Sequence, residues 1–143
     1  MPYFRVWFAT KRRKWLLQGD VLDTVRGLLA EIADEKDIDL LESEAVVDHV
    51  HLLLSLQNGA DLPRTMMLLT GISARRIFER FEDLKLAAGT DSFWQSGYGS
   101  KLVEPPAIAN VRNYIRTQWD RLESYDRPSM PRGSARGTAQ FRE

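Results

Sequence analysis

Residues 48–55 read DHVHLLLS, and this stretch holds both histidines of the chain at the front of an apolar run. A short apolar run without glycine or proline is typical of a buried β-strand. Side chains alternate along a strand, so His49 and His51 lie on one face while Val50 and Leu52 lie on the other, with the two histidine Cβ atoms roughly 6 to 7 Å apart. Two imidazoles at this spacing can converge on one divalent ion, or they can form a polar patch at the end of a sheet.

The segments around this strand predict a small antiparallel sheet accompanied by helices. Strands are predicted at 3–10, 38–44 and 46–56, with a tight turn at about 43–45 and a short final strand or irregular edge within 93–103. Helices are predicted at about 20–36, 63–84 and 105–125, from apolar residues at spacings of three and four. This order predicts an α+β fold, in which an antiparallel sheet has helices packed on one face, close to a ferredoxin-like arrangement.

The composition limits the class of protein. The chain has 143 residues, enough for one domain with a core and too few for two comfortable ones. It has no cysteine, which excludes disulfides, thiolate zinc sites and thiol nucleophiles, so any metal must be held by nitrogen and oxygen. No apolar run approaches the roughly 20 residues of a membrane span, and the N-terminus lacks the zones of a signal peptide. We therefore expect a cytoplasmic protein with no membrane partner.

Basic residues are clustered even though the formal net charge is zero. The clusters are, in chain order, Lys11–Arg12–Arg13–Lys14; Arg75, Arg76 and Arg80; Arg112 and Arg116; and Arg127, Arg132, Arg136 and Arg142. Each cluster alone is typical of a solvated surface, but several together favour a polyanionic partner. The last segment is also rich in proline, serine and glycine. We therefore expect one domain at 1–125 and a basic, disordered tail at 126–143.

The last predicted helix contains NVRNYIRTQWDRL at 110–122. Helical spacing places Tyr114 and Gln118 one turn apart, on or beside the apolar stripe. Leaving a buried glutamine amide unpaired costs about 1 to 3 kcal/mol, and a metal site beneath the helix would supply a partner. Tyr114 alone is more typical of a structural tyrosine, with a buried ring and a hydrated hydroxyl, than of a catalytic one. Asp48 precedes the strand and should point to its opposite face, so we expect a turn residue rather than a ligand.

Taken in order, these motifs resemble the HUH-type single-tyrosine transposases of bacterial insertion sequences, which include the repeat-associated tyrosine transposases. HUH denotes two histidines around a hydrophobic residue. The motifs that carry the resemblance are TKRRKWL at 10–16, DHVHLLLS at 48–55, GISARRIF at 71–78, FWQSGY at 93–98 and NYIRTQ at 113–118. Replication and conjugation nucleases share the histidine pair but usually combine the tyrosine with a lysine. The spacing of Tyr114 and Gln118 is similar to the transposase branch.

The resemblance implies an HUH endonuclease fold and a metal-dependent transposase that cuts and rejoins single-stranded DNA with hairpin ends, usually as a homodimer. It implies that His49, His51 and Gln118 bind Mg²⁺ or Mn²⁺, and that Tyr114 attacks phosphorus to give a 5′-phosphotyrosine link. The basic clusters fit this partner, and the residues expected to contact DNA phosphates are Lys11, Arg12, Arg13, Lys14, Arg75 and Arg76.

Two other functions are compatible with the same residues. The first is a DNA-binding relative that recognises hairpins or repeats without transposition activity. The second, less favoured, is a small metal-dependent phosphoesterase that uses the histidine pair without the tyrosine. Formation of a covalent protein–DNA adduct separates the transposase from the first alternative, and hydrolysis that survives Tyr114→Phe would indicate the second.

Overall fold

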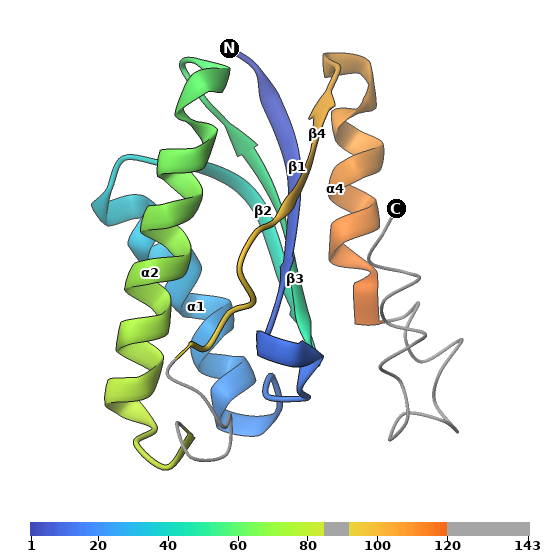
Figure 1. The fold of residues 1–143 in the computed structure, drawn as a ribbon. Helices are drawn as coiled ribbons and strands as arrows, with labels where there is room; N and C mark the ends of the chain where they lie inside the picture. The colour runs from blue at the N-terminus through green and yellow to red at the C-terminus, as the bar shows by residue number, and fades with distance from the viewer. Residues whose placement is uncertain (85–91, 120–143) are drawn as a thin grey trace.

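The computed structural model describes residues 1–84 and 92–119, and every structural statement below concerns these two ranges. Its elements are β1 Tyr3–Ala9, η1 Lys11–Arg13, α1 Gly19–Glu35, β2 Asp39–Val46, β3 His49–Ser55, η2 Gly59–Asp61, α2 Leu62–Arg80, β4 Gly99–Val103, η3 Pro105–Ala107 and α4 Ile108–Arg116 (Figure 1). The end of the last predicted helix, at 120–125, and the predicted tail at 126–143 lie outside the described residues.

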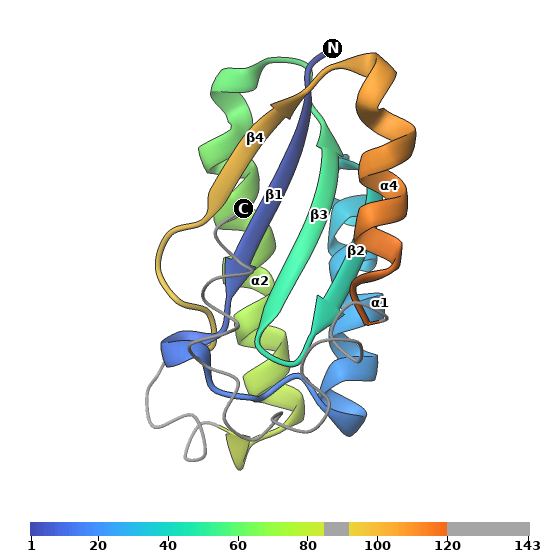
Figure 2. The same ribbon diagram turned by 90° about the vertical axis from the view of Figure 1, so that its right-hand side faces the viewer.

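The four strands form one antiparallel sheet in the order β2-β3-β1-β4 (Figure 2). β3 is central and is buried along its whole length. Both faces of this strand are therefore covered, which explains why its sequence is an apolar run rather than a simple alternation of apolar and polar residues. The histidines are the polar residues at its N-terminal end.

Helices α1 and α2 pack side by side on one face of the sheet, and they enclose the main core (Figure 1). α1 forms where predicted, because its apolar residues fall on one side: Val25, Leu28, Leu29 and Ile32 are all buried. Within residues 1–84 and 92–119, no helix combines the length and apolar character needed to cross a membrane. The predicted α+β fold with an antiparallel sheet is confirmed.

Helix α4 lies on the opposite face of the sheet, against β2 and β3 (Figures 1 and 2). The expectation that all helices share one face is therefore wrong for this helix. The reason is a second apolar cluster, in which Leu53 of β3, Val103 of β4 and Ile115 of α4 are buried together. Leu53 points away from the main core, and α4 covers it. Helix α4 therefore lies on the sheet face that carries the two histidines.

The turn between β2 and β3 differs from the predicted position. Residues 43–45 continue β2, and the turn is made by Val47 and Asp48. Val47 has a φ of 34°, in a region that β-branched residues rarely adopt, so no local sequence signal marks this turn. The turn is held by two backbone hydrogen bonds: Leu17 N donates to Val47 O at 2.9 Å, and Thr10 N donates to Asp48 O at 2.9 Å. Contacts from distant segments therefore fix the start of β3.

Candidate active site

The two histidines lie at the N-terminal end of β3, on the face that α4 covers. His49 and His51 are 3% and 2% exposed, and their ring centroids are 5.0 Å apart with the rings nearly perpendicular. Strand alternation accounts for their shared face, as predicted. The two imidazoles are buried and adjacent, so they do not form the solvent-exposed polar patch that was the other interpretation of the sequence.

His49 is oriented by a hydrogen-bonded chain that includes Asp48 and Arg13. His49 Nδ1 donates to Asp48 Oδ1 at 2.8 Å, and Arg13 Nε donates to Asp48 Oδ2 at 3.2 Å. A carboxylate only accepts hydrogen bonds, so Nδ1 carries a proton and Nε2 is the His49 nitrogen that can bind a metal. In metalloproteins the second ring nitrogen of a ligating histidine often donates to a carboxylate in the same way, so His49 is oriented as such a ligand would be.

Asp48 is a residue whose role the sequence reasoning missed. It is a turn residue, as expected, but its side chain bends back to His49 instead of pointing to the opposite face. Strand alternation does not apply in a turn, so the predicted direction was wrong. An aspartate directly before a histidine at a turn is the signal that could have indicated it, because short acidic side chains readily bond to neighbouring residues there.

His51 is neutral at neutral pH. Burial is the main cause that lowers its pKa well below 6.5, and the nearby charges of His49 and Arg5 lower it further. Neutral imidazole is the form that binds metal ions, because the ligating nitrogen must carry a lone pair. The same environment that excludes water from His51 therefore keeps it in the metal-binding state.

This low pKa predicts that the metal-free protein loses stability as the pH falls below 6.5. Unfolded His51 binds a proton below that pH whereas folded His51 does not, so acid favours the unfolded chain. The expected loss between pH 7.5 and pH 5.5 is on the order of 1 kcal/mol. Urea unfolding at several pH values measures it, and His51→Gln should remove this part of the slope. Equal slopes in the two proteins would contradict a neutral, buried His51.

Tyr114 of α4 reaches His51, and Gln118 follows one residue after the C-cap of this helix, Thr117. The ring centroids of Tyr114 and His51 are 5.8 Å apart, in an edge-to-face contact. Gln118 is 7% exposed, and its Nε2 donates to Tyr114 O at 2.8 Å. This bond occupies the donor end of the amide, so Oε1 is the atom that could bind a metal. The contact between Tyr114 and His51 is made within a single chain.

Helix α4 is fixed to β2 by polar contacts on both sides of the tyrosine. Glu42 Oε2 accepts from Arg112 Nε at 3.3 Å and from Arg116 Nε at 2.8 Å. Trp119 Nε1 donates to Ala45 O at 2.9 Å. Contacts before and after Tyr114 limit rotation and sliding of the helix. They also explain why an acidic residue, Glu42, lies within β2.

The donor set fits a metal that accepts nitrogen and oxygen ligands. Among the described residues, no three histidine, cysteine, aspartate or glutamate side chains are placed so that they could hold a metal ion together. Two imidazoles supported by Asp48 therefore need a ligand of another type, and the Gln118 amide oxygen is of that type. Imidazole and amide ligands suit Mn²⁺ and, with water completing the shell, Mg²⁺.

The basic segment 11–14 lies at the same end of the sheet as the histidines. Ala9 pairs with His49 in the sheet register, so the segment begins next to the site. Arg12 is exposed, and Lys11 and Lys14 are half-buried. Arg13 differs from these three, because its guanidinium turns inward to Asp48. The structure thus brings the first basic cluster next to the histidine pair. Arg13 holds Asp48, and the other three residues lie at least partly at the surface.

Arg75 and Arg76 lie in α2. This helix packs on the sheet face opposite α4 (Figure 1), whereas the histidines lie on the face that α4 covers. Arg75 is exposed. Arg76 is bonded to α1, where its NH2 lies 2.8 Å from Glu35 Oε1 and its NH1 lies 3.4 Å from Glu31 Oε1. The structure does not bring these two arginines together with the site, and their contact with DNA stays a prediction.

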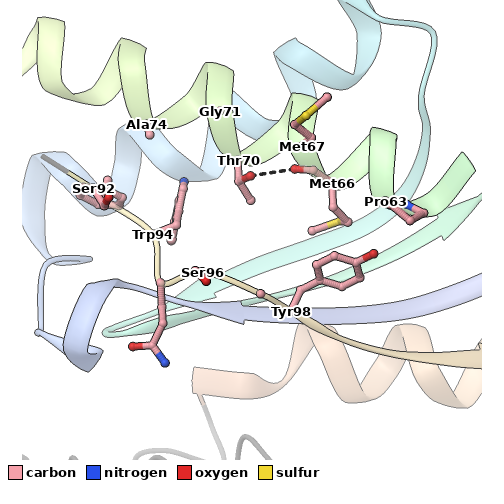
Figure 3. A pocket seen from close by; sticks show the side chains of 13 residues that line it. Pro63, Met66, Met67, Thr70, Gly71, Ala74, Ser92, Trp94, Ser96 and Tyr98 are labelled. Carbon is pink, nitrogen blue, oxygen red and sulfur yellow. Dashed lines mark hydrogen bonds between the residues drawn. The ribbon is translucent and has the colours of Figure 1, made fainter.

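An open groove separates α2 from the segment at 92–98, and it is distinct from the histidine site (Figure 3). Met66, Met67, Thr70, Gly71 and Tyr98 are among the residues that line it. Trp94, at its base, belongs to the core: its Nε1 donates to Ser73 Oγ at 2.8 Å, and its ring packs edge-to-face on Phe8 and Phe93. The groove contains none of the four predicted site residues.

Sequence comparisons identify relatives over most of the chain. The family model described as "Transposase IS200 like" matches residues 2–118. The ISDra2 transposase TnpA of Deinococcus radiodurans is 31% identical over 121 residues, which are 85% of this chain and 86% of that protein. The transposase for insertion sequence element IS200 of Salmonella typhimurium is 28% identical over 128 residues, covering 90% of this chain and 84% of that protein.

Two solved structures of transposases are similar to this chain. The crystal structure of a putative transposase from Deinococcus radiodurans has a TM-score of 0.67 at 30% identity, and the match covers 82% of this chain and 92% of that one. A REP-associated tyrosine transposase bound to a REP hairpin has a TM-score of 0.57 at 14% identity, with coverage of 81% and 65%, and supports the fold alone. Because the family match extends from before β1 to Gln118, the chain belongs to the IS200-like transposase family.

Proposed function

We propose that this transposase cleaves and rejoins single-stranded DNA at hairpin-flanked sites through a 5′-phosphotyrosine on Tyr114. The observation that carries the proposal is the packing of Tyr114 against His51, with ring centroids 5.8 Å apart. A tyrosine that only fills space needs no buried imidazole pair beside it. Tyr114 of α4 and His51 of β3 come from different elements and are in ring contact, which supports a metal-assisted phosphoryl transfer with Tyr114 as nucleophile.

The covalent step exchanges one phosphate ester for another. Tyr114 Oη forms a bond to phosphorus while the bond from phosphorus to the 3′ oxygen breaks. The phenol proton passes to solvent, and the leaving 3′ oxygen takes up a proton to become a hydroxyl. An incoming 3′-hydroxyl reverses the step and releases Tyr114. The phosphodiester energy is kept in the tyrosine ester, so rejoining needs no ATP.

His49, His51 and Gln118 would hold Mg²⁺ or Mn²⁺ in this proposal. When bound, such an ion polarises the scissile phosphate and stabilises charge on its non-bridging oxygens. The protein prepares the ligands in advance: Asp48 fixes the His49 ring, and burial keeps His51 neutral. An ordinary tyrosine has a pKa near 10, so the environment of Tyr114 must also assist its attack.

The surface next to the site supports a DNA partner. The segment at 11–14 presents Lys11, Arg12 and Lys14 beside His49, where they can contact phosphates of a bound strand. The REP-associated transposase, which has a similar fold, is bound to a REP hairpin, and we extend hairpin DNA to this chain as part of the proposal. A homodimer is part of the proposal, and the edge strand β4, with Leu102 55% exposed, is a surface where a second copy could pair.

The test is incubation of the wild-type protein with labelled single-stranded DNA carrying candidate hairpins, with Mn²⁺, Mg²⁺ or EDTA, followed by denaturing gels. We expect a protein–DNA adduct that forms with either metal and disappears with EDTA. Tight hairpin binding without an adduct would support the DNA-binding alternative. Cleavage by hydrolysis without an adduct would support the phosphoesterase.

A further inference from the structure

Trp119, just beyond the end of α4, is bonded to the edge of the sheet. Its indole Nε1 donates to Ala45 O at 2.9 Å. Ala45 belongs to β2, which is an edge strand, and in the sheet register it lies between the partners of His49 and His51. The indole therefore meets the sheet at the level of the histidine pair.

Helix α1 provides a second contact to the same indole. Arg26 Cζ lies 5.8 Å from the centroid of the Trp119 ring, which is within the range of a cation–π contact. Arg26 is itself held, because its Nε donates to Glu44 Oε1 at 2.9 Å, and this oxygen also accepts from Ala45 N at 3.0 Å. Since α1 and α4 lie on opposite faces of the sheet, these contacts join three elements around the edge of β2 (Figure 2).

Gln118, the residue before Trp119, is separated from α4 by a break. The helix ends at Arg116, Thr117 is its C-cap, and Gln118 follows. The regular hydrogen bonds of α4 therefore do not by themselves set the position of Gln118 relative to the sheet. Its side chain is nevertheless buried, and Nε2 donates to Tyr114 O at 2.8 Å. The bond made by the next residue is the contact that ties this part of the chain to the sheet.

We propose that Trp119 is a positioning residue, whose bond to Ala45 O holds Gln118 beside the histidine pair for metal binding. The inference rests on the proposed function, because it assumes that Gln118 is the third ligand. A ligand held in place before the ion arrives loses little conformational freedom on binding, and residues that support ligands change metal affinity 10 to 100-fold. An indole N–H can only donate and a backbone carbonyl can only accept, so this bond has a single direction.

The test measures the affinity of the DNA-free protein for Mn²⁺, by electron paramagnetic resonance of the free ion. Wild type is compared with Trp119→Phe, Gln118→Ala and the double variant. Trp119→Phe keeps an aromatic ring beside Arg26 and removes the donor, and it should weaken Mn²⁺ binding by about 10-fold. In the Gln118→Ala background the same substitution should have almost no effect, because the side chain that it positions is already absent.

Arg112→Gln is the matched control. Arg112 also ties α4 to β2, because it donates to Glu42 Oε2 at 3.3 Å, but it lies earlier in the helix than Tyr114. This variant should bind Mn²⁺ nearly as tightly as wild type. An equal loss of affinity in Arg112→Gln and Trp119→Phe would mean that any loosening of α4 has the same effect, and it would overturn the inference.

The two backgrounds separate positioning from general damage to the fold. A loss of stability caused by Trp119→Phe would weaken Mn²⁺ binding equally with and without Gln118, and this result would overturn the inference. So would weaker binding by Gln118→Ala with unchanged binding by Trp119→Phe, while the proposed function would stand. If Gln118→Ala binds Mn²⁺ as tightly as wild type, the proposed set of ligands fails first, and the role of Trp119 fails with it.

Discussion

Tyr114→Phe is expected to abolish the covalent protein–DNA adduct and to reduce strand cleavage by about 10⁴-fold or more. The substitution removes the atom that bonds to phosphorus. It keeps the ring that packs edge-to-face on His51 and faces the Arg5 guanidinium, so the fold and the binding of DNA should be retained. Denaturing gels measure the adduct, and a native binding assay on the same DNA measures retention of the substrate.

Tyr3→Phe is the matched control for this prediction. Tyr3 lies in β1 on the same sheet face and packs against the same apolar cluster as Tyr114. It should keep both cleavage and the adduct. A variant Tyr114→Phe that still forms the adduct would place the nucleophile elsewhere, and one that still hydrolyses DNA would support the phosphoesterase.

His49→Ala and His51→Ala are expected to lower the affinity for Mn²⁺ by at least about 100-fold, since the loss of even an outer-shell partner costs 10 to 100-fold. Adduct formation should fall in parallel, because each variant removes one of the two nitrogen ligands from the proposed set of three. Titration followed by electron paramagnetic resonance of free Mn²⁺ measures binding without any dependence on activity.

Ser55→Ala controls for disturbance of the strand. Ser55 is buried on the same face of β3, at the far end from the histidines, and it should leave Mn²⁺ binding unchanged. Asp48→Asn should fall between this control and the histidine variants, because an amide holds the His49 ring less well than a carboxylate. Unchanged Mn²⁺ affinity in both histidine variants would show that the pair does not hold the metal.

Local sequence patterns predicted the parts of the site that lie within single elements. Period-two alternation placed His49 and His51 on one face of β3, and helical spacing placed Tyr114 and Gln118 one turn apart. The structure brings Tyr114 to His51, with ring centroids 5.8 Å apart. These relations depend on the geometry of one strand and one helix, which the sequence reports directly.

Features that depend on packing between elements could not be predicted in the same way. The turn at Val47 and Asp48 is set by hydrogen bonds from Leu17 and Thr10, and its positive φ at a valine has no sequence signature. Because Asp48 lies in that turn, its bond to His49 was also missed. The position of α4 on the second face depends on covering Leu53, whose direction is fixed only once the sheet has formed.

The most direct test of the central claim is to locate the DNA on the protein by mass spectrometry. The adduct would be formed with wild-type protein, digested with nuclease and trypsin, and sequenced by fragmentation. Cleavage after Arg112 and Arg116 gives the peptide Asn113–Arg116, which contains Tyr114 and no other hydroxyl side chain. We predict that the nucleotide remnant is carried by this peptide, as a phosphate ester of Tyr114. A remnant on Tyr3, Tyr98, Tyr125 or any serine or threonine would contradict the account.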